Sequence, residues 1–163
     1  MSLIVHKGYL PGSIGRVVDL HARFYSDLVD FGLPFETKVA RELSEFCERY
    51  DDNCDGFWLL LQDGIVEGSI AIDGSKANQN GAHLRWFITS DKLRGTGAGT
   101  ALLTAAMDFC QSHQYRCVYL CTFDGLGAAR HLYEKFGFRL VHQQQGKQWG
   151  SEVSEQRFER NAS

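Results

Sequence analysis

A glycine-rich segment in the middle of the chain restricts the possible folds more than any other stretch. Arg94 is followed by alternating glycines at Gly95, Gly97 and Gly99, and an apolar helical stripe comes next. Because glycine has no Cβ atom, the backbone can turn sharply here and approach a ligand closely. A helix that begins at this point adds unpaired N–H donors and the positive end of its dipole. The segment therefore predicts a site that holds a diphosphate through backbone amides.

Three kinds of diphosphate site can be compared with this pattern. A Walker A motif needs a lysine before its Ser or Thr, but Thr100 is preceded by Gly99. A dinucleotide-binding fingerprint needs its third glycine where Thr100 stands. The pattern fits better the diphosphate of coenzyme A, held by backbone amides with Arg94 beside them. A tight turn without a ligand is the remaining alternative.

Composition limits the class of protein. The chain has 163 residues, of which 44% are hydrophobic, so we expect one domain spanning residues 1–163. A net charge of −3 argues against nucleic acid as a partner. We find no apolar run of about 18 residues and no secretory signal, so we expect no membrane partner and a cytoplasmic protein. The five cysteines form no repeating pair, which predicts neither a disulfide framework nor a metal site.

Hydrophobic periodicity and turn residues predict alternating strands and helices. The first helix should begin with Ser13 as its N-cap and carry an apolar stripe that ends at Leu28. An Asp-Gly pair at 63–64 predicts a two-residue hairpin turn. A later apolar strand lies between two predicted helices, which indicates a parallel crossover. The predicted strands cover residues 3–7, 57–62, 65–72, 83–89, 116–122, 138–141 and 155–159, and the helices follow residues 12, 34, 99 and 127.

A second motif follows that strand. Ala129 and Tyr133 are one helical turn apart on the same face, so the small residue leaves room for a ligand beside the phenol. Gly137 suits the left-handed position that ends a helix, and Phe138 begins the next strand. Taken alone, a tyrosine on an apolar helix stripe indicates a core residue.

With both motifs in this order, the chain resembles the GNAT superfamily of N-acetyltransferases. The resemblance implies an α+β, three-layer GNAT fold: a mixed, mostly antiparallel sheet of six to seven strands with splayed central strands, flanked by about four helices. More narrowly, the chain is similar to the acetyltransferase half of bacterial MarR-type regulator fusions, on residues 11–15, 128–131 and 149–156, with His21 and Tyr25. No winged-helix half is present, so we expect no transcription role.

The resemblance also implies a donor and residues that bind it. The donor would be acetyl-CoA, and Tyr133 would be the general acid that protonates the departing thiolate. Backbone groups of Phe87, Ile88 and Thr89 would pair with the pantetheine amides. The remaining implied donor-binding residues are Arg94, Gly95, Thr96, Gly97, Ala98, Gly99, Thr100 and Ala129. Many relatives carry an asparagine where this chain has Leu126, which removes one expected contact with coenzyme A.

The general base is left open at this point. The carboxylate that many relatives carry on the central strand is absent from His83–Trp86. Glu67, Asp73 or His21 could take the proton through water, although Glu67 also fits a solvated strand residue and His21 a core histidine. Attack by an amine that is already neutral would need no base.

The acceptor side would be formed by Tyr25, Arg85 and Trp149, with Phe31 and Phe35 nearby. Aromatic residues beside a mildly acidic surface suit a cationic amine. The expected reaction is direct acetyl transfer to a primary amine of a small molecule or of an amino terminus. A catalytically silent acyl-CoA-binding regulatory module and a nucleotide-phosphate enzyme are the alternatives, and an open strand edge would allow a homodimer.

Overall fold

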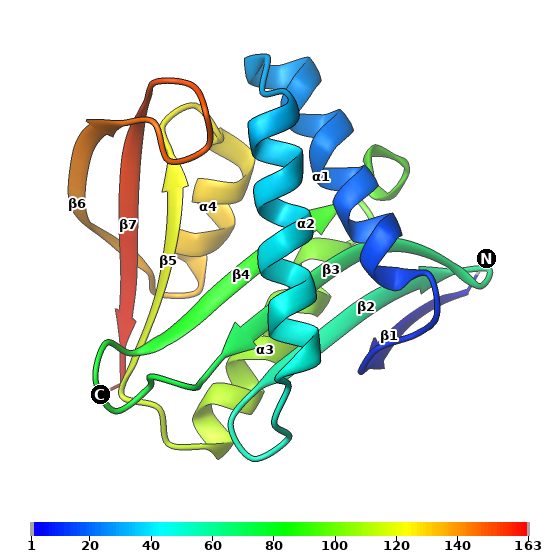
Figure 1. Ribbon diagram of the computed structural model, residues 1–163. Helices are drawn as coiled ribbons and strands as arrows, with labels where there is room; N and C mark the ends of the chain where they lie inside the picture. Colours follow the sequence, from blue (N-terminus) through cyan, green and yellow to red (C-terminus); the bar gives the residue numbers. More distant parts are fainter. Residues whose placement is uncertain (1, 163) are drawn as a thin grey trace.

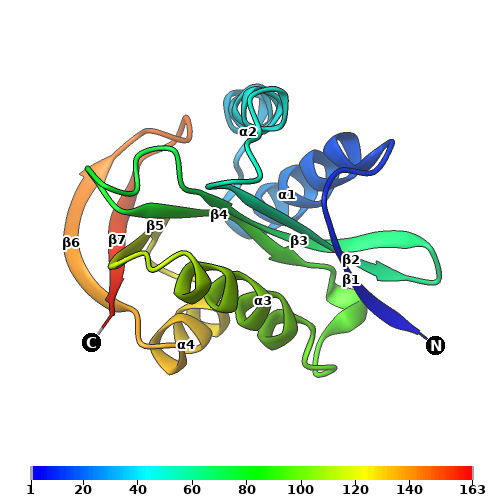
Figure 2. The same cartoon turned by 90° about the horizontal axis from the view of Figure 1, so that it is seen from below.

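The computed structural model describes residues 2–162 and contains one seven-stranded sheet with helices on both faces (Figures 1 and 2). Helices α1 and α2 cover one face, and α3 and α4 cover the other. Within residues 2–162, no helix is both long and apolar enough to cross a membrane. The elements are β1 (Leu3–Lys7), α1 (Ser13–Val29), α2 (Leu33–Glu48), β2 (Gly56–Gln62), β3 (Ile65–Asp73), β4 (Ala82–Thr89), the 3-10 helix η1 (Asp91–Leu93), α3 (Ala98–Ser112), β5 (Cys117–Phe123), α4 (Gly127–Lys135), β6 (Arg139–Gly146) and β7 (Val153–Asn161).

The central strands β4 and β5 separate soon after they meet. The strand order is β1-β2-β3-β4-β5-β7-β6, and every neighbouring pair is antiparallel except β4 and β5. These two strands pair in parallel only at Ala82 with Val118 and His83 with Tyr119. Beyond that point they diverge, as Figure 1 shows. The predicted α+β fold, its mixed sheet and the parallel crossover are confirmed.

A β-bulge in β4 lies where the two strands diverge. Ser69 pairs with Ile88 and Ala71 with Arg85, so β4 has one more residue than β3 between these pairs. Trp86 takes a left-handed φ of 49°, which is uncommon for a residue with a side chain. The Ser69 hydroxyl donates a hydrogen bond of 2.6 Å to the Trp86 carbonyl oxygen and supports this conformation. Because a bulge bends its strand, β4 turns away from β5 here.

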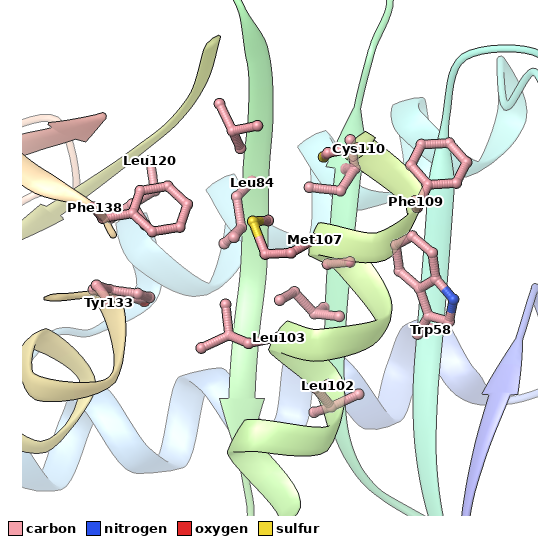
Figure 3. Close-up of a cluster of buried hydrophobic side chains, with 14 of the residues drawn as sticks. Trp58, Leu84, Leu102, Leu103, Met107, Phe109, Cys110, Leu120, Tyr133 and Phe138 are labelled. Carbon is pink, nitrogen blue, oxygen red and sulfur yellow. The ribbon is translucent and has the colours of Figure 1, made fainter. Parts of the chain in front are cut away.

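Each face of the sheet carries its own hydrophobic core. On one face Leu102, Leu103 and Met107 of α3 point toward the strands, with Tyr133 and Trp58 at opposite sides of the cluster (Figure 3). On the other face the apolar stripes of α1 and α2 pack against the sheet together with aromatic side chains. The site between β4 and β5 is therefore reached by helices from both layers.

Most predicted elements are confirmed, and the details that are wrong have local causes. The hairpin turn is present, with left-handed φ angles at Asp63 and Gly64. Ser13 is not the N-cap of α1, because Gly12 takes that position and the Ser13 hydroxyl accepts a hydrogen bond from the Leu10 amide at 3.3 Å. Leu28 is 47% exposed, so the buried stripe ends before it. The strands β6 and β7 are longer than predicted because they pair with each other along their polar sequences.

Candidate active site

The gap between β4 and β5 holds a pocket of about 150 Å³. Side chains from α1, α2, β4, β5 and α4 and from the β6–β7 loop line it. It brings together several residues that were predicted from distant parts of the sequence. These are His21, Tyr25, Arg85, Phe87, Tyr133 and Trp149.

Tyr133 lies at the inner end of this pocket and is 7% exposed. Its ring lies 5.9 Å from the ring of Phe87 and 6.1 Å from that of Phe138, measured between centroids. Burial raises the pKa of the phenol far above its ordinary value. Among residues 2–162 its hydroxyl has no hydrogen-bond partner, and it is not sealed from solvent. The structure thus leaves a protonated donor facing open space.

A second pocket of about 240 Å³ lies on the other side of Tyr133. The end of β5 and the start of α4 line it, and Leu126 stands in its wall. Thr122, Phe123 and Tyr133 border both pockets, so the phenol stands at the junction between them. Tyr133 could therefore contact a ligand in either pocket.

His21 and Tyr25 of α1 form the aromatic wall of the first pocket. His21 is 5% exposed, and its Nδ1–H donates to the Val17 carbonyl oxygen at 2.8 Å, which leaves Nε2 as an acceptor. Burial lowers the pKa of His21 to about 4, so the ring is neutral at physiological pH. Burial also raises the pKa of Tyr25 to about 12.

Trp149 closes the pocket from the loop between β6 and β7. Its ring lies 5.6 Å from that of Phe123 and 6.5 Å from that of Phe31. The next residue, Gly150, has a left-handed φ of 98°, and a Cβ atom there would come within 2.7 Å of Pro34. Close contact with the start of α2 therefore holds this loop over the pocket.

Glu67 is not brought to the pocket. It is 2% exposed, and its carboxylate lies 2.6 Å from the Arg16 guanidinium and 3.6 Å from the Lys92 ammonium. Asp73 is likewise outside the pocket, and Arg49 lies 2.5 Å from it. Both carboxylates balance arginine charges at the edge of the α1–α2 layer, which does not support a role as base.

The sequence analysis missed two charged residues that line the pocket, Lys38 and Glu42 of α2. The Glu42 carboxylate is paired with both Lys38 and Arg85, and the Arg85 guanidinium lies 4.2 Å from the centre of the Trp86 ring. Lys38 and Glu42 are four residues apart, a spacing that indicates a helical ion pair but does not indicate which way it faces. With two cations and one carboxylate, the charged lining has the opposite sign from that expected for a cationic amine.

The glycine-rich turn is exposed and carries free backbone donors. Gly95 and Gly97 have left-handed φ angles of 76° and 82°, and a Cβ atom at either would meet nothing within 4 Å. The first hydrogen bond of α3 runs from the Ala101 amide to the Gly97 carbonyl oxygen, so the amides at 98–100 precede it. The Arg94 side chain is 81% exposed and lies 3.1 Å from Asp91. An open cradle with unpaired amides fits a diphosphate.

The remaining predicted donor-binding residues lie at the edge of β4 and at the start of α4. Because β4 pairs with β5 only at Ala82 and His83, the backbone of Phe87–Thr89 has no strand beside it on that side. Gly99 packs tightly, since a Cβ atom there would lie 3.0 Å from Leu132 of α4. Ala129 is half-buried one turn before Tyr133, as the spacing predicts.

The thiols and the metal-binding residue types show no reactive arrangement. Burial raises the pKa of all five cysteines, to about 12 for Cys110, so their thiols are protonated at neutral pH. In the part of the chain that the structure describes, no three His, Cys, Asp or Glu side chains gather in a way that could hold a metal ion.

Comparison with known proteins agrees with this geometry. The sequence pattern of the Acetyltransferase (GNAT) family matches residues 17–138, which is most of the chain. The chain belongs to the GNAT family. The match contains both motifs and all of the strands that form the gap, whereas β6, β7 and Trp149 lie beyond it.

Similar sequences include the N-acetylaspartate synthetases. The rat protein is 35% identical over 83 residues, which are 51% of this chain and 27% of that protein. The protein from Xenopus tropicalis is 28% identical over 100 residues, covering 61% of this chain and 36% of its own length. The chain therefore matches only about a third of each of these relatives.

Solved structures of similar shape cover nearly the whole chain. An acetyltransferase of the GNAT family from Staphylococcus aureus superposes with a TM-score of 0.79 at 16% identity, covering 99% of this chain and 100% of that one. A putative phosphinothricin N-acetyltransferase gives a TM-score of 0.75 at 16% identity, covering 99% of each chain. At such low identity these likenesses show the fold alone.

Proposed function

We propose that the protein is an acetyl-CoA-dependent N-acetyltransferase that moves an acetyl group directly onto a primary amine. The observation that carries this proposal is the unpartnered hydroxyl of Tyr133, which faces the junction of two pockets. A purely structural tyrosine at this depth would be expected to find an acceptor, because buried polar groups without one are costly. The narrower resemblance to MarR-type fusions stays a prediction.

The residues that would hold the donor act through their backbone. The amides of Gly95 and Gly97–Thr100 would bind the diphosphate, since those of Arg94 and Thr96 donate to Asp91 and Leu93. The Arg94 side chain would add a charge-assisted contact. The free edge of Phe87–Thr89 would hold the pantetheine amides like a neighbouring strand, and half-buried Ala129 would leave room beside Tyr133. When bound, acetyl-CoA supplies the thioester that the amine attacks.

Tyr133 would act as the general acid. Its raised pKa keeps the phenol protonated at every physiological pH, so the donor form is always present. A thiolate has an ordinary pKa of about 8.5, and the same poorly solvated environment raises its proton affinity too. The phenol would therefore donate a hydrogen bond to the sulfur and pass its proton to it as negative charge builds there, provided that burial raises the proton affinity of the thiolate as it does that of the phenol.

We propose that the acceptor attacks as a neutral amine, oriented by His21. The Nε2 atom of His21 is the acceptor nitrogen that the Val17 hydrogen bond leaves free on a residue lining the pocket. With a pKa of about 4, the ring is a weak base but a permanent hydrogen-bond acceptor at neutral pH. The proton that the amine nitrogen loses after attack would pass through water to the Tyr133 phenolate and restore the phenol. Glu67 receives no role in this mechanism because its carboxylate is engaged by Arg16 and Lys92.

The acceptor would be a small amine, with Tyr25, Arg85 and Trp149 around it, because the pocket of about 150 Å³ has little room. Relatives named N-acetylaspartate synthetase support a small amino acid as one candidate. An amino terminus would enter the same pocket with only its first residue.

The test combines calorimetry with acetyl-CoA and an assay of released thiol over a panel of small primary amines and short peptides. We expect acetyl-CoA to bind and thiol release to depend on the amine. The absence of acetyl-CoA binding would refute the proposal. Binding without turnover of any amine would favour the alternative, a silent acyl-CoA-binding module.

A further inference from the structure

We propose that the acceptor amine carries a carboxylate, and that Arg85 and Lys38 bind this carboxylate at the outer end of the first pocket. The inference rests on the proposed function, since it names the substrate class for the same site. It is carried by the arrangement of three charged side chains, Lys38, Glu42 and Arg85, which we call the charged triad.

The charged triad joins the two walls of the pocket. Lys38 and Glu42 lie one turn apart on α2, and Arg85 reaches them from β4. Their side chains are only 25%, 23% and 23% exposed, so all three are held within the pocket mouth and not on the open surface. Glu42 contacts Lys38 through one carboxylate oxygen and Arg85 through the other.

Arg85 retains donors that no protein group uses. Its contact with Glu42 involves Nη2 alone, and within residues 2–162 the Nε and Nη1 groups have no acceptor. These nitrogens are not sealed inside the protein, because no buried side-chain nitrogen of the described residues lacks a partner. They therefore face the open part of the pocket. A carboxylate there could bind two guanidinium N–H groups at once. This bidentate geometry is the strong form of an arginine–carboxylate contact.

The charge of the lining favours an anion. Two cations face one carboxylate, and the two histidines of the pocket are neutral. Burial lowers the pKa of His21 to about 4, and burial together with Arg85 lowers that of His83 to about 3. The lining therefore carries one net positive charge. In a partly buried site such a charge attracts an anion and repels an ammonium group.

Arg85 is also placed to orient the amine. Its guanidinium lies 4.2 Å from the centre of the Trp86 ring, a stacking contact that limits its movement. Phe87, two residues further along β4, lies beside Tyr133 with ring centroids 5.9 Å apart. Arg85 and Tyr133 line the same pocket, so an acceptor anchored at Arg85 would have the phenol in the same cavity.

The main competing interpretation is that Glu42 binds the ammonium form of the acceptor or takes its proton. Its environment argues against this, since Lys38 and Arg85 occupy both of its oxygens. Burial raises the pKa of this carboxyl group, but the contacts with Lys38 and Arg85 together outweigh burial and leave the pKa lowered. In our proposal Glu42 holds the two cations in place and weakens their attraction for the incoming carboxylate.

The test compares amines that differ only in their carboxylate. Glycine, β-alanine and L-aspartate are assayed beside glycinamide, β-alaninamide and L-aspartic acid diamide, and kcat and KM are measured separately. We expect kcat/KM at least about tenfold higher for the acids, since a charged hydrogen-bonded contact contributes about 1.5–3 kcal/mol. The amino groups of the three amides have a lower pKa than those of the acids, so a larger fraction of them is neutral and able to attack. Intrinsic reactivity alone would therefore favour the amides over the acids.

Variants assign the preference to the charged triad. Arg85→Gln should raise KM for the acids by about tenfold or more, and by much less for the amides. Glu42→Gln should lower KM for the acids, because it frees both cations, and should change kcat less than KM. Arg41→Gln is the matched control, because Arg41 is an exposed residue of α2 that does not line the pocket. A large loss of kcat in Glu42→Gln would overturn the proposal in favour of a base.

A binding measurement keeps this inference separate from the proposed function. Thermal melting of the protein with coenzyme A is followed while succinate or succinamide is added, which needs no turnover. Succinate should raise the melting temperature more than succinamide in the wild type and in Arg41→Gln, and this difference should disappear in Arg85→Gln. Equal effects of the two compounds on the wild type, or equal turnover of acids and amides, would overturn the inference even if acetyl transfer is found.

Discussion

The glycine-rich turn and the pocket between β4 and β5 are two halves of one proposed site, but they are built differently. The turn, Arg94–Thr100, is mostly exposed and presents unpaired backbone amides from the consecutive residues Gly97–Thr100. The pocket is built from buried side chains that arrive from distant elements on both faces of the sheet. Binding by the turn should therefore tolerate changes of side chain, whereas the pocket should depend on individual groups.

The two regions also differ in how they should respond to pH. The turn contains no histidine, tyrosine, cysteine or carboxylate. In the pocket, burial raises the pKa of Tyr25 and Tyr133 and lowers the pKa of His21. The same desolvation that gives the pocket its chemistry should therefore make it the pH-sensitive part of the fold. Four substitutions test this contrast.

The largest effect is expected from Tyr133→Phe. Loss of a general acid should lower kcat by about 10²–10⁴-fold, while the dissociation constant for acetyl-CoA should change little, because the turn is untouched. Steady-state kinetics and calorimetry measure the two quantities separately. Retention of full kcat would remove Tyr133 from the mechanism and leave it a core residue.

The second test follows stability with pH in His21→Gln. The pKa of His21 is about 4 when folded and 6.5 in the unfolded chain, so the unfolded state binds more protons between these values. Stability should therefore fall as the pH drops through this window, with a contribution from His21 of about 2 kcal/mol between pH ~7.5 and pH ~5. Urea unfolding should be measured at both pH values. Between them, the free energy of unfolding should fall less in the variant than in the wild type, by that amount. Parallel losses in the two proteins would mean that His21 is not buried as a neutral ring.

Third, Gly97→Ala should weaken the binding of acetyl-CoA by the turn without altering the pocket. Gly97 has a φ of 82°, where a side chain costs roughly 1–2 kcal/mol. We expect about five- to thirtyfold weaker acetyl-CoA binding if all of that strain is relieved by distorting the cradle. Gly15→Ala on α1 is the control, because Gly15 is helical, exposed and has open space around it. Unchanged acetyl-CoA affinity in Gly97→Ala would separate the turn from donor binding.

The smallest effect is expected from Arg94→Gln. This side chain is 81% exposed and its contact with Asp91 is on the surface, so stability should hardly change. Acetyl-CoA affinity should fall by only about two- to fivefold, and the loss should shrink at high salt because exposed charges are screened. A loss as large as that of Gly97→Ala would mean that side-chain charge, and not the backbone, dominates the cradle.

The regions that could be predicted from sequence are those whose structure is set by nearby residues. The glycine-rich turn, the Asp63–Gly64 hairpin and the spacing of Ala129 and Tyr133 follow from local backbone preferences and helical periodicity. The apolar stripe of α3 was found for the same reason. Ser13 was misassigned because a neighbouring glycine can cap a helix equally well through its backbone.

The sequence by itself determined the layered fold, the position of the turn and the tyrosine that faces it, because period, glycine conformation and helix termini are local properties. Only the tertiary structure decided which charges meet. Glu67 lies on a predicted strand and Glu42 on a predicted helix, but packing placed Glu67 against Arg16 and brought Glu42 to Arg85, a residue 43 positions away. Long-range pairing of this kind depends on how helices pack across a bulged strand, and no local pattern encodes it.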